Sequence, residues 1–353
     1  MSAVRSENNS ILRRFSPVVW TLVLCSLVAL AAPLSATDRL GRVVNVIPTN
    51  CRTVRGAGGI PDAACYIADV SCPGIADQQV GVKVNQPAGQ PIGTVLFQVG
   101  GTGSPFYDIK FEFGRVALEN VLAAGYTTVQ FNFMFPPQGS RGEMQAGWFT
   151  GPGGPRELAC RWSTMAKWAH DTLNEGAKPF CATGNSAGSA LIGYALADYG
   201  LSPLFNMVEE TSGPPLARID HGCLCNARND TPCGQGVRPE CYGGDANAYL
   251  DPSYQSNACS SAERVHHSSM LKTFMHDSLG SPDATYNYPF TDIHFVFGGQ
   301  DNTNAPPQAM EWIPLISARG TPTVDCVPDA SHQLPDVFDG ATKVADDIIN
   351  FCH

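Results

Sequence analysis

Short apolar runs alternate with amphipathic stretches along most of this chain. Runs of about five apolar or β-branched residues between turn-forming residues are typical of buried strands, whereas apolar residues at three- and four-residue spacing indicate helices. Because strands and helices alternate, we expect the α/β fold class, with a mainly parallel central sheet and helices on both faces. The pattern predicts strands at residues 80–84, 94–99, 127–133, 179–183, 206–210, 293–297 and 323–327, and helices near 114–124, 155–175, 189–197 and from 335 to the end of the chain.

Two segments depart from this alternation. Residues 37–79 are rich in turn-forming residues and hold three cysteines, so we expect a disulfide-stapled N-terminal extension or edge strands, followed by the main domain at 80–353. Residues 214–290 hold five cysteines and many glycines, prolines and asparagines. They predict a Cys-rich cap or insertion; a surface excursion unrelated to any site is the alternative.

The N-terminal residues 1–36 have the pattern of a secretory signal peptide. Arg5, Arg13 and Arg14 precede an apolar stretch at 18–32, and small residues follow it. We therefore expect a secreted protein, extracellular or periplasmic, that is free of the membrane once the signal is cleaved. An uncleaved membrane anchor is the alternative.

Cysteine usage agrees with export. Of thirteen cysteines, Cys25 lies in the predicted signal peptide, which leaves an even twelve and up to six disulfides. A zinc site at Cys223, Cys225, Cys233 and Cys241 is the alternative, but the paired C-x-x-C spacing is missing. We expect no metal and no cofactor. A Cys326–Cys352 bridge is predicted to tie the last strand to the terminal helix, with the Cys223–Cys241 cluster stapling its own loop.

Charge narrows the range of partners. The formal net charge is −10, and the predicted signal peptide carries three arginines and one glutamate, so the mature chain would carry about −12. Repulsion by phosphates makes nucleic acid a poor partner. The apolar fraction of 43% is sufficient for a large core.

The most specific motif is the pentapeptide 184–188, which reads Gly-Asn-Ser-Ala-Gly between a predicted strand and a predicted helix. A sharp strand-to-helix turn needs small neighbours, and it holds the hydroxyl of Ser186 out at the carboxyl end of the sheet. The N–H of Ala187 then lies at the start of a helix, where it can stabilise a developing oxyanion.

Serine needs a base, and the base needs a carboxylate. Asp301 and His332 each follow a later predicted strand, in the order acid then histidine that this geometry demands. Glu209 and Glu210 also lie at the end of a strand and are the alternative acids.

On these residues, the chain over about 80–353 resembles the α/β-hydrolase superfamily, and in a general way its secreted esterases, such as polyester depolymerases and feruloyl-type esterases. The resemblance implies that the glycine-rich loop after strand 94–99 supplies a second oxyanion donor, Gly101 or Thr102. The histidine that opens this loop in many lipases is replaced here by Val99. A phosphate-cradling loop is disfavoured, because no Lys-Ser/Thr follows the glycines.

The resemblance implies a secreted serine hydrolase that cleaves carboxylic esters, small or polymeric, through an acyl-enzyme. An acyltransferase, a lipase or a non-catalytic binding module on the same fold are the alternatives. Aromatic residues on loops at the expected active-site end are candidates for a substrate pocket; packing under the cap is their other interpretation. These residues are Phe106, Tyr107, Phe135, Trp148 and Phe149.

Overall fold

The computed structural model describes residues 39–134, 147–174, 176, 178–228, 231–234 and 239–353. The predicted signal peptide, residues 1–36, lies outside the described residues. Within the described ranges, no helix combines the length and the apolar character that a membrane span requires.

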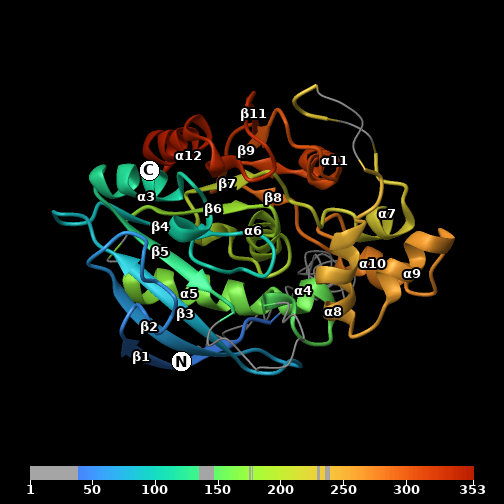
Figure 1. Cartoon of the computed structure of the whole chain (residues 1–353), viewed down its shortest axis with the longest axis horizontal. Coiled ribbons are helices and arrows are strands. Elements are labelled where there is room, and N and C mark those ends of the chain that lie inside the picture. The colour runs from blue at the N-terminus through green and yellow to red at the C-terminus, as the bar shows by residue number, and fades with distance from the viewer. Residues whose placement is uncertain (1–38, 135–146, 175, 177, 229–230, 235–238) are drawn as a thin grey trace, which may run out of the picture. The chain divides into compact units, whose positions relative to one another are not determined.

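In the described residues, nine strands form one twisted sheet (Figure 1). From β5 to β11 the neighbouring strands run parallel, while β1, β2 and β3 pair antiparallel at one edge. All seven strands predicted from the sequence are present; β1 and β2 come from the turn-rich segment before them. In spatial order the strands are β1 (Arg42–Thr49), β2 (Ala64–Ser71), β3 (Gln78–Asn85), β5 (Tyr126–Asn132), β4 (Gly93–Gln98), β6 (Phe180–Asn185), β7 (Met207–Thr211), β9 (Asp292–Gly298) and β11 (Thr323–Val327).

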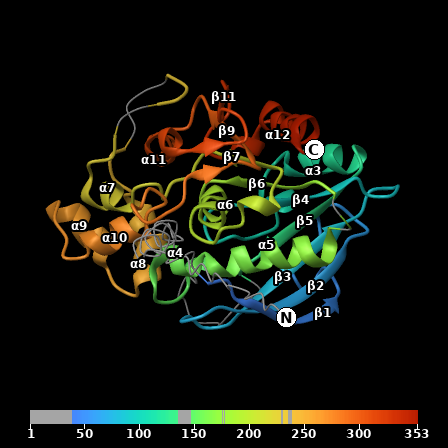
Figure 2. The ribbon, with the colours of Figure 1, turned by 180° about the vertical axis from the view of Figure 1, so that it is seen from behind.

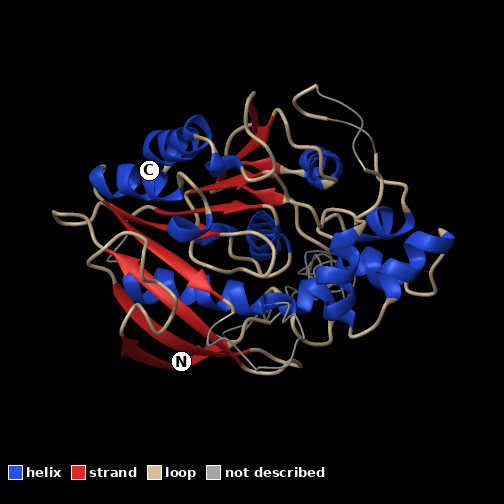
Figure 3. Ribbon diagram, in the orientation of Figure 1, coloured by secondary structure: helices blue, strands red, loops and turns tan. Residues whose placement is uncertain are grey.

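Helices cover both faces of the sheet, which confirms the predicted fold class (Figure 3). The side chains of β4 alternate: Val95 and Phe97 pack under α3 (Gly114–Ala123) and α12 (Phe338–Phe351). Leu96 belongs to the core on the other face, under α5 (Cys160–Leu173), α6 (Ala187–Ala197) and α11 (Ala305–Trp312). A strand buried on both faces must be apolar at successive positions, as the sequence of β4 is.

A Cys-rich insertion lies between β7 and β9, where the sequence predicts one at about residues 214–290, and it is called the cap below. Figures 1 and 2 show its helices gathered at one end of the molecule, beyond the carboxyl ends of the parallel strands. Each helix has only four to eight residues, too few to produce a clear period in the sequence. They are α7 (Ile219–Leu224), the π-helical η3 (Ala246–Leu250), α8 (Asp251–Tyr254), α9 (Ala258–Val265) and α10 (Leu271–Asp277).

Short elements complete the chain. The strands β8 (Asn287–Tyr288) and β10 (Ser317–Ala318) pair with each other. The remaining helices are α2 (Tyr107–Lys110), α4 (Gly154–Leu158) and the 3₁₀ turns η1 (Gly147–Phe149), η2 (Ser202–Leu204), η4 (Ile313–Leu315) and η5 (Leu334–Asp336).

All twelve cysteines among the described residues form disulfides. The pairs are Cys51–Cys65, Cys72–Cys160, Cys181–Cys352, Cys223–Cys259, Cys225–Cys241 and Cys233–Cys326.

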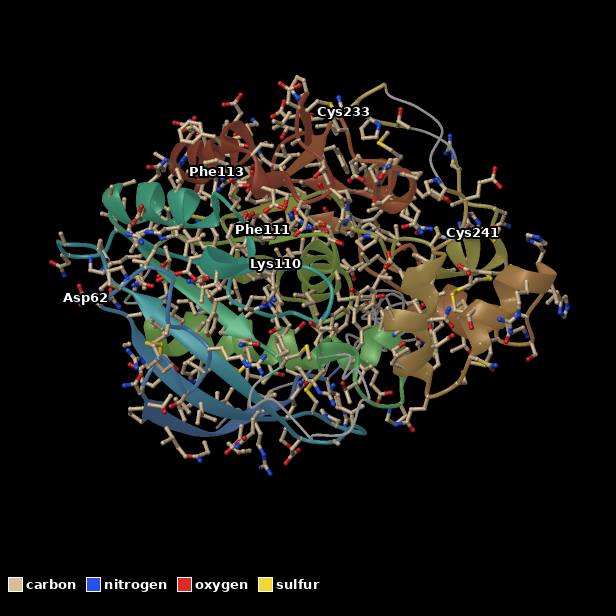
Figure 4. The ribbon with its side chains drawn as sticks, viewed as in Figure 1. Asp62, Lys110, Phe111, Phe113, Cys233 and Cys241 are labelled. Carbon is tan, nitrogen blue, oxygen red and sulfur yellow. A yellow bond between two sulfur atoms is a disulfide. The ribbon has the colours of Figure 1, made fainter. Side chains whose placement is uncertain are left out.

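The predicted Cys326–Cys352 bridge is therefore wrong, and strand alternation explains why. Asp325 faces α12, where its Oδ2 lies 2.6 Å from Nζ of Lys343, so the next residue, Cys326, points to the opposite face. There Cys326 bonds to Cys233 of the cap. Figure 4 shows Cys233 well apart from Cys241. Of the cluster that was expected to staple its own loop, only Cys225 and Cys241 pair with each other. Cys223 pairs with Cys259, elsewhere in the cap, and Cys233 ties the cap to β11.

Loop length should decide which disulfide matters most for stability. In the chain-entropy description, the Cys181–Cys352 bridge, with a sequence separation of 171, restricts the unfolded chain by about 5 kcal/mol. The Cys51–Cys65 bridge, with a separation of 14, contributes about 3 kcal/mol. We expect the Cys181→Ala/Cys352→Ala variant to lose more unfolding free energy in urea than Cys51→Ala/Cys65→Ala. Equal losses would contradict the entropic explanation.

Candidate active site

Ser186 occupies the turn between β6 and α6, with a backbone conformation that side-chain-bearing residues rarely adopt. Its φ is 58° and its ψ is −122°, and its N–H donates to the carbonyl of Thr211 on β7 (2.9 Å). A Cβ on Gly184 would lie 2.6 Å from the backbone of Gly188, and one on Gly188 would lie 2.6 Å from the carbonyl of Gln98. The glycines of the motif are therefore required by close backbone approach.

The structure brings Ser186, His332 and Asp301 together in one chain of hydrogen bonds. His332 Nε2 lies 2.8 Å from Ser186 Oγ, and its Nδ1 lies 2.9 Å from Asp301 Oδ2. The Asp301 side chain is fully buried, and His332 keeps 26% of its side chain exposed. This geometry lets the imidazole accept a proton from the hydroxyl while the carboxylate fixes its tautomer.

Thr303 completes the surroundings of the carboxylate. Its N–H and its Oγ1 both donate to Asp301 Oδ1, at 2.9 and 2.8 Å. Burial by itself raises the pKa of Asp301, but the hydrogen bonds from His332 and Thr303 outweigh it and hold the pKa below its ordinary value. Asp301 is thus an anion at neutral pH. Thr303 was not predicted; only its place two residues after the acid could have pointed to it.

Asn185 fixes the histidine loop to the serine turn. Its Nδ2 donates to the carbonyl of His332 (3.2 Å), and its Oδ1 accepts from the N–H of Leu334 (3.3 Å) and from Thr211 Oγ1 (3.1 Å). One buried amide therefore bonds to two backbone groups of the segment that begins at His332. This role of Asn185 could not be predicted, because the G-x-S-x-G motif leaves the residue before the serine unspecified.

The candidate oxyanion donors lie above Ser186. The N–H of Ala187 begins α6, and Gly101 and Thr102 form the centre of a turn closed by Gly103 N–H to the Gly100 carbonyl (3.1 Å). Gly101 has a φ of 56°, which glycine accommodates without strain. Among the described residues, no group accepts a hydrogen bond from the N–H of Ala187, Gly101 or Thr102. These three N–H groups therefore remain the candidate oxyanion donors.

The aromatic candidates occupy different places. Phe149 lines a pocket beside Ser186, while Trp148 lies behind it and donates from Nε1 to the carbonyl of Gly101 (2.9 Å). The structure puts Phe106 and Tyr107 elsewhere: Phe106 packs near the Cys51–Cys65 bridge, and Tyr107 packs under α3 and α12. Both side chains are fully buried: Phe106 directly precedes α2, and Tyr107 is its first residue. Phe135 lies outside the described residues.

Glu209 and Glu210, the alternative acids, are fully buried within β7. Glu209 accepts from Thr183 Oγ1 (2.7 Å), and burial, with repulsion from Asp347 added to it, raises its pKa well above the ordinary value. Among the described residues neither carboxyl oxygen of Glu210 has a hydrogen-bond partner, and burial raises its pKa well above the ordinary value. Burial thus favours the protonated form of both side chains, whereas the pKa of Asp301 is lowered.

The zinc alternative does not fit the described residues. The four cysteines that suggested it are all in disulfides. Over the same described ranges, no group of three or more His, Cys, Asp or Glu side chains is arranged to hold a metal ion.

The buried Glu210 should reduce stability as pH rises. Its folded pKa lies above its unfolded value of about 4.3, so above that pH the unfolded chain gains an ionisation that the folded chain lacks. We expect Glu210→Met to raise the unfolding free energy, by an amount that grows between pH 5 and pH 8 in urea titrations. Glu119→Met, at an exposed glutamate of α3, is the matched control and should show no such growth. A pH-independent gain would show that Glu210 does not stay protonated.

Comparisons with known proteins agree on the fold. No protein-family model and no curated protein sequence matches the chain. Among solved structures it is similar to esterase Est22, at 14% identity and a TM-score of 0.50, over 86% of this chain and 84% of that one. It is also similar to acetyl xylan esterase 1 from Thermoanaerobacterium sp. (14% identity, TM-score 0.49, 86% and 87% covered). A third is esterase Pf2001 from Pyrococcus furiosus (12%, 0.49, 90% and 99%). With the sheet order and the serine turn described above, the chain has the α/β-hydrolase fold.

Proposed function

We propose that this protein is a secreted serine hydrolase that cleaves carboxylic esters through an acyl-enzyme. The observation that carries the proposal is the hydrogen-bond chain from Ser186 Oγ through His332 to the buried Asp301, at the end of a strained strand-to-helix turn. A hydroxyl held in this way next to a base is a nucleophile ready for acyl transfer.

In the first half of the reaction, Ser186 Oγ attacks the ester carbonyl carbon while His332 Nε2 takes its proton. The carbonyl oxygen becomes an oxyanion, which the N–H of Ala187 and that of Gly101 or Thr102 stabilise. His332 then gives the proton to the alcohol oxygen as the carbon–oxygen bond breaks. The alcohol leaves, and the acyl group stays on Ser186.

In the second half, water takes the place of the alcohol. His332 removes a proton from the water as its oxygen attacks the acyl carbon. The second tetrahedral intermediate collapses, Ser186 recovers its proton from His332, and the carboxylic acid leaves. Throughout, Asp301 remains ionised and stabilises the imidazolium, as its lowered pKa requires.

Export fits the same proposal. Six disulfides are typical of an oxidising compartment, extracellular or periplasmic, and the signal-like residues 1–36 would direct the chain there. We therefore propose that the substrate is an ester outside the cytoplasm and that the reaction uses no cofactor.

Substitution and labelling of Ser186 test the reaction. Ser186→Ala should lower turnover of p-nitrophenyl acetate by several orders of magnitude, since only binding and the oxyanion donors would remain. Phenylmethylsulfonyl fluoride should modify Ser186, as peptide mass spectrometry would show. Ser163→Ala, at a buried serine of α5, is the control and should keep its activity. A Ser186→Ala variant that stays active, with the inhibitor found on another serine, would refute the assignment. A wild type that hydrolyses no ester would favour a non-catalytic binding module.

The acid can be assigned by a second pair of substitutions. Asp301→Asn should cost roughly 10⁴-fold in kcat, because the amide cannot hold His332 in the tautomer that accepts the serine proton. Glu209→Gln should cost far less, because Glu209 bonds to Thr183 and not to His332. If Glu209→Gln lowers kcat more than Asp301→Asn does, the catalytic acid is Glu209 of β7 and not Asp301.

A further inference from the structure

Ser186 lies where two cavities of very different size meet. The first, here called the small pocket, has a volume of about 40 Å³ and is lined by Phe149, Leu216, Tyr242, Leu250 and Ala187 among others. The second, here called the open cleft, has a volume of about 380 Å³ and extends past Ser104, Lys110, Phe111 and Gln333. Both include Ser186 and His332, so an ester bound at Ser186 would place one half in each.

The linings of the two cavities favour one direction for the ester. His332 and Gly101 line both cavities, so the candidate catalytic groups reach a substrate from either side. Leu216 and Leu250 line only the small pocket and suit an alkyl chain, whereas Ser104, Lys110 and Gln333 line only the open cleft. The acyl chain is therefore assigned to the small pocket and the alcohol to the open cleft.

The small pocket is restricted in length. One water needs about 10–15 Å³ of such space, so 40 Å³ accommodates about three water-sized groups beyond the carbonyl carbon. Its apolar walls, Leu216 and Leu250, are almost completely buried and suit a short alkyl chain. A longer chain would have to displace packed side chains, which is costly.

The walls are also fixed in place. Tyr242 donates from its hydroxyl to the carbonyl of Pro215 (2.9 Å). Its ring packs so closely on Gly222 of α7 that a Cβ at Gly222 would lie 2.2 Å from a ring carbon. The Cys225–Cys241 bridge ends one residue before Tyr242. This wall is therefore held from both sides, and the pocket has little freedom to expand.

The open cleft adds hydrogen-bonding groups that the small pocket does not have. Ser104, Lys110 and Gln333 line only the open cleft and offer a hydroxyl, an ammonium and an amide, beside the apolar ring of Phe111. Figure 4 shows Lys110 and Phe111 next to each other at the end of α2. Donors and acceptors beside one aromatic ring suit an alcohol that carries several hydroxyl groups, such as a carbohydrate, better than an alkyl chain.

We propose that the protein removes short acyl groups, up to about four carbons, from larger alcohols that carry hydroxyl groups. This specificity rests on the proposed ester hydrolysis at Ser186. The small pocket sets the acyl limit, and the open cleft selects the alcohol.

The acyl limit is tested with p-nitrophenyl acetate, butyrate and octanoate, which share one alcohol. One methylene in a fitted apolar pocket changes kcat/KM about 10–200-fold, so we expect kcat/KM to fall at least about 100-fold from acetate to octanoate. Leu216→Ala and Leu250→Ala, which lengthen the pocket, should reduce that ratio by about 10-fold or more. Leu118→Ala removes an equally buried leucine on the other face of the sheet and should keep the wild-type ratio.

The outcomes separate the two proposals. A wild type that cleaves octanoate as well as acetate keeps ester hydrolysis but overturns the short-acyl limit. A wild type that cleaves neither, although Ser186 is intact, overturns ester hydrolysis itself. An unchanged ratio in both pocket variants would show that the small pocket does not hold the acyl chain.

The alcohol preference is tested with two acetates, an acetylated glucoside and n-octyl acetate. We expect kcat/KM to be at least about 10-fold higher for the glucoside, which corresponds to one additional hydrogen bond. Gln333→Ala should remove most of that preference and leave the acyl-chain ratio as it is in the wild type. A preference for octyl acetate would overturn the carbohydrate-like alcohol and point to an apolar one.

Discussion

The strained backbone at Ser186 is the constraint on which the rest of the site depends. A φ of 58° with a ψ of −122° persists only where the surrounding structure holds it. Here β4, β6 and α6 approach so closely that a Cβ on Gly100, Gly184 or Gly188 would lie within 2.7 Å of backbone or of Ser186 itself. The same close approach brings the loop after β4 over the serine hydroxyl, so one packing arrangement sets both the nucleophile and the candidate oxyanion donors.

The cap depends on this arrangement through an aromatic stack. Tyr249 of η3 stacks on Phe149, with ring centroids 5.5 Å apart, and Phe149 stacks on Trp148 at 3.7 Å. Trp148 in turn donates to the Gly101 carbonyl (2.9 Å). A change in the cap that moves Tyr249 would therefore reach the turn that carries Gly101. In the proposed function, this stack would couple substrate specificity to oxyanion binding.

The sequence predicted features that are local. Seven strands, the serine turn and the order of Ser186, Asp301 and His332 follow from short patterns, since each is encoded within about ten residues. The Cys326–Cys352 bridge failed because pairing depends on which face of β11 each side chain takes and on where the cap lies. Asn185, Thr303 and the inward orientation of Phe106 and Tyr107 arise from tertiary contacts, and the residue types alone carry no signal of them.

The choice of Asp301 as the acid shows what decides the state of a buried carboxyl group. Asp301, Glu209 and Glu210 are all fully buried, so burial alone would raise the pKa of each. Asp301 differs because His332 and Thr303 donate three hydrogen bonds to it. Among the described residues Glu209 accepts one, from Thr183, and Glu210 accepts none. Hydrogen-bond donors stabilise the charged form and can reverse the effect of burial. The number of donors, which only the folded chain brings together, is therefore what favours Asp301 as the acid in the proposed reaction.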